Sequence, residues 1–369
     1  MQDKEINKIR LFIPGPTNVS DETLRIGSIQ YGYFRDDDFT RLNLENEKNF
    51  LDFTGCKNGR VIPLTCSGTG AMEAILVNVV KKDDNILVIN GGPFAERWYK
   101  MCRFFKYEKM HNLDIGFGRD IDTKILEDAI KNNDIDTILC QSNETPSGQL
   151  YDIEAIGELS KKHGCTLIVD AIGSLFADDF RMDEWNVDVS LVSTQKGLRL
   201  PSGMAYVIIN RRAIKLLTNP RSFYFNFNLY LEDYQLGRGH TPFTPNVTLI
   251  HQVNQKLREI KKMGIASQIE EMHDKAVFFR ELCKDMPLTP IAQTPSNLET
   301  GYVINNIEKY DATELYEYLK KKNIYIWRSG KQMKRWLDNP VRRHIIISHN
   351  GCSKEDHKDL VEHMKRYFK

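Results

Sequence analysis

The chain has 369 residues, of which 41% are hydrophobic, so it is long enough for one large domain and one smaller domain, each with its own core. Lys and Arg number 51 against 50 Asp and Glu. This balance excludes the strong positive field expected of a nucleic-acid-binding or membrane-surface protein. No apolar run approaches the roughly 20 residues of a membrane span. The expected partner is a small molecule or another subunit.

The cysteines and the N-terminus bear on the cellular compartment. The seven cysteines are odd in number, and none lies in a C-x-x-C pair or at a zinc-ligand spacing. His240 and His251 are not at a metal-binding spacing either. The stretch 1–16 alternates charged and apolar residues, where a signal peptide would need a continuous apolar segment. We therefore expect free thiols, no metal and a cytoplasmic protein.

Between residues 61 and 209, short β-branched runs alternate with amphipathic helical stretches. This alternation predicts an α/β fold with a mostly parallel sheet between helices. A complete helix is expected between Asp152, which can cap its start, and Gly164, which can end it. The predicted strands are 61–65, 85–90, 136–141, 166–172, 189–194 and 204–210.

After Pro245 the sequence changes to long charged helices and a few short strands, which is typical of a small α+β domain. We expect a large domain over residues 1–255 and a small domain over 256–369. The predicted elements of this region are helices at 246–263, 265–284, 311–322 and from 354, and strands at 301–305, 324–328 and 344–348.

Two loops that follow predicted strands carry groups able to bind a charged ligand. Ser67–Gly70 opens an apolar helix, and the small residues Gly68 and Thr69 would let backbone N–H groups face a phosphate. Asp170 ends a buried strand, where its carboxylate could keep a pyridinium nitrogen protonated. Taken singly, the first loop also fits ordinary turn formation, and Asp170 also fits a helix cap or a structural ion pair.

Lys196 follows the next strand, and its amine could form an imine with an aldehyde cofactor. Phe94 and Thr145 also follow strands. The ring of Phe94 could stack on a cofactor ring, and the hydroxyl of Thr145 could contact ring substituents. A lone lysine is more often a surface residue and a lone aromatic more often part of the core. It is the combination that indicates a site for pyridoxal 5′-phosphate (PLP).

Several segments, in this order, resemble the class V aminotransferases of PLP fold type I, and the resemblance runs through nearly the whole chain. They are residues 14–17 (PGPT), 67–70 (SGTG), 144–148 (ETPSG), 152–164, 167–175 (LIVDAIGSL) and 193–203 (STQKGLRLPSG). The last two are the most specific in combination. The resemblance implies PLP as the cofactor, held in a large domain with a seven-stranded type of sheet.

The resemblance also implies a role for each matching residue. Lys196 would form the Schiff base, Asp170 would pair with the pyridine nitrogen, and Phe94 would stack on the ring. Gly68 and Thr69 would hold the phosphate. The remaining residues that would line the cofactor are Thr145, Ile172 and Gln195.

The segment 240–245 resembles the family stretch that crosses a dimer interface to the partner's phosphate, with Thr241 and Thr244 as the expected contacts. The resemblance therefore implies a homodimer with shared active sites.

One departure from the family pattern concerns the substrate. Family members commonly clamp the substrate carboxylate with an arginine in a late strand, and Ile346 stands at that position here. The substrate is then held in another way, or another arginine substitutes. The candidates are Arg35, Arg199, Arg328, Arg342 and Arg343.

The resemblance implies a transaminase that moves an amino group from a small primary amine or amino acid to a small 2-oxo acid such as pyruvate or glyoxylate. Donors of the alanine, serine and 2-aminoethylphosphonate types fit, and GLRLPSG (197–203) looks closer to the alanine–glyoxylate branch. The alternative is a PLP-dependent lyase or a cysteine desulfurase, for which Cys352 is the candidate thiol. A second alternative, from a different functional class, is a non-catalytic protein that binds a ligand or a protein partner on the same scaffold.

Overall fold

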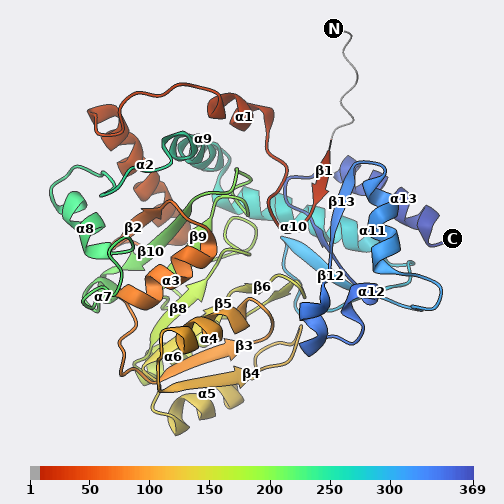
Figure 1. Ribbon diagram of the computed structural model, residues 1–369, viewed down its shortest axis with the longest axis horizontal. Helices are drawn as coiled ribbons and strands as arrows, with labels where there is room; N and C mark the ends of the chain where they lie inside the picture. The colour runs from red at the N-terminus through yellow and green to blue at the C-terminus, as the bar shows by residue number, and fades with distance from the viewer. Residues whose placement is uncertain (1–8) are drawn as a thin grey trace.

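The computed structural model describes residues 9–369, so the N-terminal stretch behind the cytoplasmic expectation lies partly outside the described residues. Within them the chain forms two large sheets, one in each half of the molecule in Figure 1, and a two-stranded hairpin. No helix among residues 9–369 is long and apolar enough to cross a bilayer.

The larger sheet has seven strands in the order β2-β10-β9-β8-β5-β3-β4. Only β10 runs antiparallel to its neighbours. The bounds are β2 (Gly59–Leu64), β3 (Ile86–Asn90), β4 (Met110–Asp114), β5 (Thr137–Gln141), β8 (Thr166–Asp170), β9 (Val189–Ser193) and β10 (Ala205–Asn210). Six of these match predicted runs. Strand β4 was not predicted, because this edge strand is only partly buried and lacks an apolar run.

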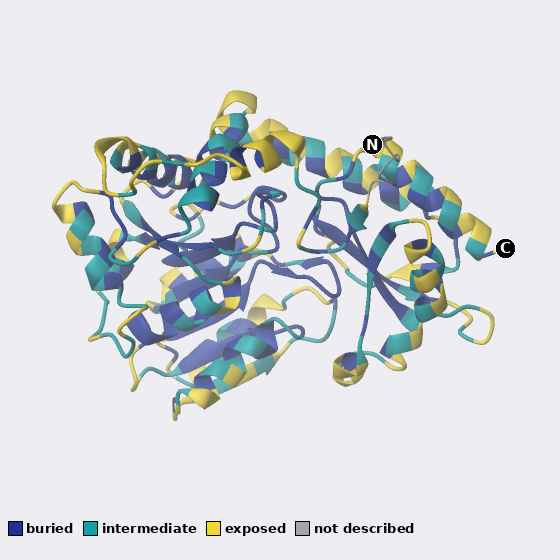
Figure 2. Cartoon of the chain, turned by 45° about the horizontal axis from the view of Figure 1, so that its top comes forward, coloured by how far each residue is buried: buried dark blue, intermediate teal, exposed yellow. Residues whose placement is uncertain are grey.

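Helices cover both faces of this sheet, as the alternating pattern predicted. One face packs against α2 (Asp37–Thr54), α5 (Thr123–Asn132), α6 (Ile153–His163) and α9 (Val247–Met263). The other packs against α3 (Gly68–Asn78), α4 (Ala95–Phe104), α7 (Arg211–Ile214) and α8 (Phe227–Gln235). Figure 2 shows the strands between them buried and the outer helix faces exposed.

The smaller sheet has five strands in the order β1-β13-β14-β12-β11. Its strands are β1 (Arg10–Phe12), β11 (Leu288–Pro290), β12 (Glu299–Ile304), β13 (Ile324–Arg328) and β14 (His344–Ser348). Its longer helices are α10 (Ile265–Leu282), α11 (Ala312–Lys320) and α13 (Lys354–Tyr367). Because β1 pairs with β13, an N-terminal strand completes a sheet otherwise built from the last third of the chain. A domain boundary at residue 255 stays a prediction.

The hairpin of β6 (Asn143–Glu144) and β7 (Gln149–Leu150) lies against the smaller sheet. The Nε2 of His344 donates to the carbonyl of Pro146 at 2.7 Å. A Cβ on Gly301 would lie 2.5 Å from the same carbonyl oxygen, so backbone meets backbone here. The loop that carries Thr145 is thus packed directly against β12 and β14.

Helix α6 has the predicted ends: the Asp152 side chain accepts from the N–H of Ala155, and Gly164 ends the helix at φ 75°. Gly157 in the same helix packs against backbone, because a Cβ there would lie 1.7 Å from the carbonyl oxygen of Trp185.

These two glycines make a matched pair for a test of the packing. Gly157→Ala should lower the free energy of unfolding by roughly 2–3 kcal/mol because the helix must shift away from Trp185. Gly164→Ala, with nothing within 4 Å of the added Cβ, should cost only about 1 kcal/mol through its left-handed backbone. Urea unfolding measures both, and equal losses would contradict this account of Gly157.

Candidate active site

The carboxyl ends of five strands lie at one edge of the larger sheet, because these strands run in the same direction. Five of the predicted site residues follow these ends. Gly68 comes after β2, Phe94 after β3, Thr145 after β5, Asp170 at the end of β8 and Lys196 after β9. The tertiary structure therefore brings to one edge groups that are more than 120 residues apart in the sequence.

Helix α3 begins at this edge and presents its N-terminus to the site. Ser67 caps it by accepting the N–H of Gly70 at 3.4 Å. Gly68 is tightly packed, because a Cβ there would lie 2.3 Å from Cδ1 of Ile172. The exposed hydroxyl of Thr69 accepts a hydrogen bond of 2.7 Å from a guanidinium nitrogen of Arg97. A helix N-terminus beside a guanidinium favours an anion such as a phosphate.

Asp170 is 5% exposed and lies beside β5 and β9. One of its carboxylate oxygens accepts the N–H of Ile172 at 2.9 Å. Burial raises the pKa of Asp170 to about 6, although that hydrogen bond and the positive charges of Arg97 and Lys196 lower it. A buried carboxylate of this kind is suited to a cationic partner such as a pyridinium N–H.

Lys196 is buried, and its Nζ lies 6.0 Å from the centre of the Phe94 ring. Burial is the main cause that lowers the pKa of Lys196, while the carboxylates of Glu299 and Asp170 act in the opposite direction. A neutral amine is the form that attacks an aldehyde carbon. The backbone turn is close-packed, since a Cβ on Gly15 would lie 2.9 Å from the carbonyl oxygen of Gln195.

Phe94 precedes helix α4, and Glu144 holds this helix end in place. The N–H groups of Phe94 and Ala95 donate to the two carboxylate oxygens of Glu144 at 3.0 and 3.1 Å. Burial raises the pKa of Glu144 to about 7. The guanidinium of Arg97 lies 4.7 Å from the centre of the Phe94 ring.

The other residues expected to line the cofactor lie close by. Thr145 is buried, with its hydroxyl 3.5 Å from the side-chain oxygen of Asn143. Ile172 is half-buried and covers Gly68, and Gln195 is half-buried beside Lys196 with its carbonyl facing Gly15. Their assignment to individual cofactor atoms stays a prediction.

Several buried polar atoms near this edge have no hydrogen-bond partner among residues 9–369. They are the Oγ of Ser193, both side-chain polar atoms of Gln141 and the Nδ2 of Asn143. Ser193 and Gln141 end the two strands on either side of β8. Buried groups of this kind need partners. With Lys196, Asp170 and the start of α3, these residues fit a flat polar cofactor that carries a phosphate, as PLP does.

The two threonines of the predicted dimer segment differ in exposure: Thr241 is buried and Thr244 is exposed. The Thr241 hydroxyl donates to the carbonyl of Phe243 at 2.7 Å within its own loop. Contacts of either residue with a partner's phosphate stay a prediction.

Five arginines were candidates to replace the family's carboxylate-binding arginine, and most of them have contacts outside the site. Arg342 pairs with Asp311, and Arg328 lies over the ring of Tyr316. Arg199 donates to the side-chain oxygen of Asn350 at 2.7 Å. Arg343 is half-buried, and Arg35 donates to the carbonyl of Thr241 at 3.5 Å. Ile346 is buried on β14.

Three residues at the site were missed by the sequence analysis. Arg97 lies one helical turn after Phe94, and this i, i+3 spacing could have indicated it. Asn350 donates to the carbonyl of Lys196 at 2.6 Å from the far end of the chain. Glu299 is fully buried and is the first residue of β12, which begins two residues earlier than predicted. No local signal identifies Asn350 or Glu299, because both reach Lys196 only through tertiary packing.

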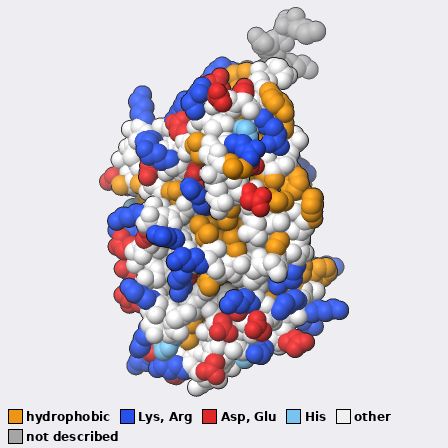
Figure 3. Space-filling model, turned by 90° about the vertical axis from the view of Figure 1, so that its left-hand side faces the viewer, with side chains coloured by type: hydrophobic (Ala, Val, Ile, Leu, Met, Phe, Trp, Pro, Cys, Tyr) orange, Lys and Arg blue, Asp and Glu red, His pale blue; other side chains and the backbone are white. Residues whose placement is uncertain are grey.

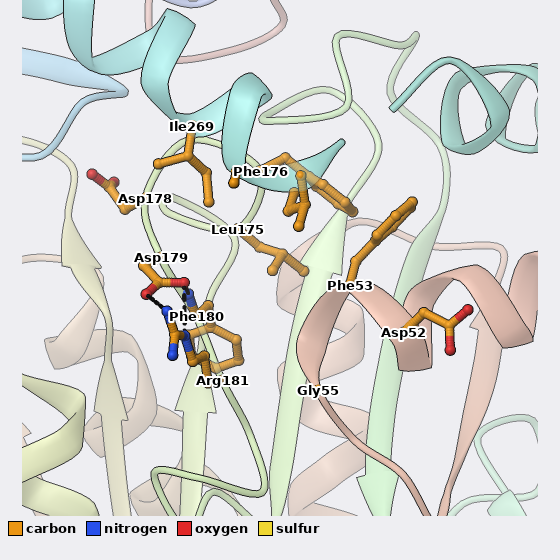
Figure 4. Close-up of a pocket in the computed structure, with 12 residues that line it drawn as sticks. Asp52, Phe53, Gly55, Leu175, Phe176, Asp178, Asp179, Phe180, Arg181 and Ile269 are labelled. Atoms are coloured by element: carbon orange, nitrogen blue, oxygen red, sulfur yellow. Dashed lines mark hydrogen bonds and ion pairs between the residues drawn. The ribbon is translucent and has the colours of Figure 1, made fainter. Parts of the chain in front are cut away.

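A separate cavity of about 250 Å³ lies outside this group of residues and is shown in Figure 4. It is lined by the end of α2, the segment 175–181 and the start of α10. The segment 175–181 packs directly against the turn that follows Lys196, because a Cβ on Gly197 would lie 2.0 Å from the carbonyl oxygen of Leu175.

The family described as aminotransferase class V matches residues 33–347. The match covers most of the chain, so the chain belongs to the class V aminotransferase family. Enzymes of this family use PLP, and the residues described above fit that cofactor.

Two relatives illustrate the similarity. The L-aspartate–glyoxylate aminotransferase of Paracoccus denitrificans is 31% identical over 281 residues, covering 71% of this chain and 67% of the relative. The serine–glyoxylate aminotransferase of Arabidopsis thaliana is 30% identical over 272 residues, covering 70% and 66%. The fold matches that of an alanine–glyoxylate aminotransferase from Nostoc sp. with a TM-score of 0.90 at 22% identity, covering 100% of this chain and 97% of the other.

The raised pKa of Asp170 leads to a pH-dependent prediction for the cofactor-free protein. Its pKa of about 6 in the folded state exceeds the ordinary value of about 3.9. The folded state therefore holds this proton more tightly, and the resulting stability is complete below pH 4 and is lost as the pH rises through 6. Asp170→Asn should therefore stabilise the cofactor-free protein by about 3 kcal/mol at pH 8 and hardly at all at pH 4. Thermal unfolding over this range measures the effect. The exposed Asp285→Asn is the control, and a pH-independent gain for Asp170→Asn would contradict the prediction.

Proposed function

We propose that this enzyme moves an amino group from a small primary amine or amino acid to a small 2-oxo acid such as pyruvate or glyoxylate. The proposal rests on the placement of Asp170 and Lys196 at the carboxyl ends of the adjacent strands β8 and β9, where both side chains are buried. They lie beside the N-terminus of α3, which could bind a phosphate. The names of the relatives support a 2-oxo acid acceptor of the glyoxylate type.

When bound, PLP supplies a ring that accepts the electron pair left by the substrate carbon. Asp170 would hold the ring nitrogen protonated through its ionised carboxylate. Lys196 would bind the cofactor covalently and, once displaced by the substrate amine, would carry the proton between the substrate carbon and the cofactor. Burial of Lys196 favours its neutral form, which both tasks require.

The remaining residues would position the cofactor. Phe94 would stack on the ring, while Gly68 and Thr69 would bind the phosphate, with Arg97 contributing charge through its contact with Thr69. Glu144 fixes the start of α4 and so the position of Phe94. Thr145, Ile172 and Gln195 would complete the lining.

The desulfurase alternative requires a reactive cysteine, and Cys352 is poorly suited to that role. Its thiol is buried and lies between the Asn18 amide, 3.4 Å away, and the carbonyl of Leu11, 3.5 Å away. Burial raises the pKa of Cys352 to about 12, so the thiolate is scarce at neutral pH.

Replacement of Lys196 tests the central role. Lys196→Ala should reduce turnover by about 1,000-fold or more and remove the covalent label that borohydride leaves at this position of the loaded wild-type enzyme. Turnover assays and peptide mass spectrometry measure these effects. Lys284→Ala, on an exposed helix end, is the control. Product formation by the wild-type enzyme should also require an added 2-oxo acid, and turnover without one would favour a lyase.

We also propose a homodimer with shared active sites. Phe223 and Tyr224 are 79% and 40% exposed, and Tyr224 stacks on Phe243, between the two threonines of the predicted interface segment. Figure 3 shows one face of the molecule, on which hydrophobic side chains gather in a patch with charged side chains around it. Burial of exposed aromatic rings is typical of subunit interfaces.

Mixing two defective variants tests this assembly. Lys196→Ala should be complemented by the Thr241→Val, Thr244→Val double variant, because each mixed dimer would contain one intact site. Recovery should approach about a quarter of the wild-type activity in a statistical mixture. A monomer in size-exclusion chromatography, or no recovery after mixing, would contradict the proposal.

A cytoplasmic location is also proposed. All seven cysteines are free, and six of them are buried, which suits a reducing compartment.

A further inference from the structure

Glu299 presents a buried carboxylate beside the candidate active site, and the mechanism above gives it no role. Its side chain is 0% exposed. Neither carboxylate oxygen has a hydrogen-bond partner within normal distance among residues 9–369. An ionised carboxylate left in this state costs several kcal/mol, so the carboxyl holds its proton more tightly and its pKa rises. A cationic group from outside the chain would stabilise the ionised form.

The alternation along β12 determines where Glu299 points. Tyr302 and Ile304 lie in the core of the smaller sheet. Because side chains alternate along a strand, Glu299 and Gly301 lie on the opposite face. That face meets the loop of Thr145, since Gly301 packs against the carbonyl of Pro146. Glu299 therefore faces the larger sheet and its site edge.

The same face of the neighbouring strand carries Ile346. Gly301 is paired with Ile346, and Glu299 is paired with Ser348, so Glu299 and Ile346 are diagonal neighbours. Such neighbours lie about 7–8 Å apart across adjacent strands. Trp327 on β13 is paired with Ile346 from the other side.

This face of β12, β13 and β14 carries no lysine or arginine. Its one basic side chain is His344, and burial lowers the pKa of His344 to about 4, so the ring is neutral at physiological pH. The cation that does most to lower the pKa of Glu299 is Lys196. Lys196 is committed to the cofactor in the loaded enzyme, so it cannot serve as a permanent partner for Glu299.

The backbone around Glu299 is held firmly. Asp178 is a second buried carboxylate, and it accepts from the hydroxyl of Ser296 at 2.6 Å and from the N–H of Asn297 at 2.8 Å. The N–H of His349 donates to the carbonyl of Leu298 at 2.8 Å. Asp178 is therefore satisfied by its neighbours. Glu299 is rigidly placed, and among residues 9–369 it has the Thr145 hydroxyl nearby but no hydrogen bond of normal length.

We infer that Glu299 forms a subsite for a second, positively charged group of the amine substrate, so that the preferred donor is a short diamine and not an α-amino acid. One amine would react at Lys196 while the other pairs with Glu299. An α-carboxylate at this position would meet the ionised carboxylate of Glu299 at pH 8.5 and no arginine on this face of the smaller sheet. This inference rests on the proposed transaminase function and specifies its donor.

The first experiment compares amines of matched length on the loaded wild-type enzyme at pH 8.5. The donors are ethylenediamine, 1,3-diaminopropane and putrescine, the monoamines propylamine and butylamine, the amino alcohol 3-aminopropanol, and alanine. We expect kcat/KM for the best diamine to exceed that for the monoamine of equal length by about 100-fold. Burial raises the pKa of Glu299 to about 8, so its carboxylate is largely ionised at the pH of the assay.

The second experiment compares Glu299→Gln with the wild-type enzyme. The substitution keeps the shape and removes the charge, so the preference for the diamine should fall to within a few-fold of unity. Glu362→Gln, an exposed charge removal on α13, is the control and should keep the wild-type ratio. Glu299→Asp should retain part of the preference. It therefore serves as the second variant if Glu299→Gln fails to fold.

A binding measurement separates recognition from turnover. In Lys196→Ala loaded with PLP, an added amine changes the absorbance of the cofactor but is not converted, so titration gives Kd. The diamine should bind about 100-fold more tightly than the monoamine, and the further change Glu299→Gln should remove this difference.

The outcomes distinguish the two proposals. If no primary amine, alanine included, aminates the cofactor, the transaminase function fails. If alanine or a monoamine reacts as well as the diamines, or if Glu299→Gln leaves the ratio unchanged, the subsite is overturned. Preference for 3-aminopropanol over 1,3-diaminopropane would also overturn it, because the partner would then be a hydroxyl and not a cation.

Discussion

The backbone turn that carries Lys196 is held between the two halves of the molecule, and the rest of the site depends on it. Asn350, which follows the last strand of the smaller sheet, donates to the carbonyl of Lys196, and the Arg199 guanidinium donates to Asn350 in turn. Gly15 and Gly197 have no room for a side chain against this turn. The lysine is thereby fixed in position before any cofactor binds, which is what accurate covalent attachment requires.

Burial gives the site its electrostatic character. Asp170, Glu144 and Glu299 all lie in a poorly solvated region beside the lysine, and burial raises the pKa of each carboxyl. Glu144 is satisfied by two backbone N–H groups at the start of α4. Under the proposals above, Asp170 would pair with the cofactor and Glu299 with the substrate. A site of this kind is less stable when empty and gains stability on loading.

The inferred subsite would place the choice of amine substrate on the smaller sheet. With Ile346 in the late strand and Glu299 as its diagonal neighbour, this face lacks an arginine and carries a carboxyl group. The residues expected to hold the cofactor lie on the larger sheet, so under this proposal the reaction type and the donor would be determined by different halves of the molecule. Conservation of chemistry with a change of substrate is common where one unit holds the cofactor and another contacts the substrate.

The α/β class and six strands of the larger sheet could be predicted from the amino-acid sequence, because β-branched runs and turn residues act locally. The loop residues Gly68, Phe94, Asp170 and Lys196 could be predicted since each follows a recognisable strand. The positions of Arg97, Asn350 and Glu299 at the site, and the pairing of β1 with β13, became known only from the folded chain. These depend on contacts between segments up to about 300 residues apart, which no local pattern encodes.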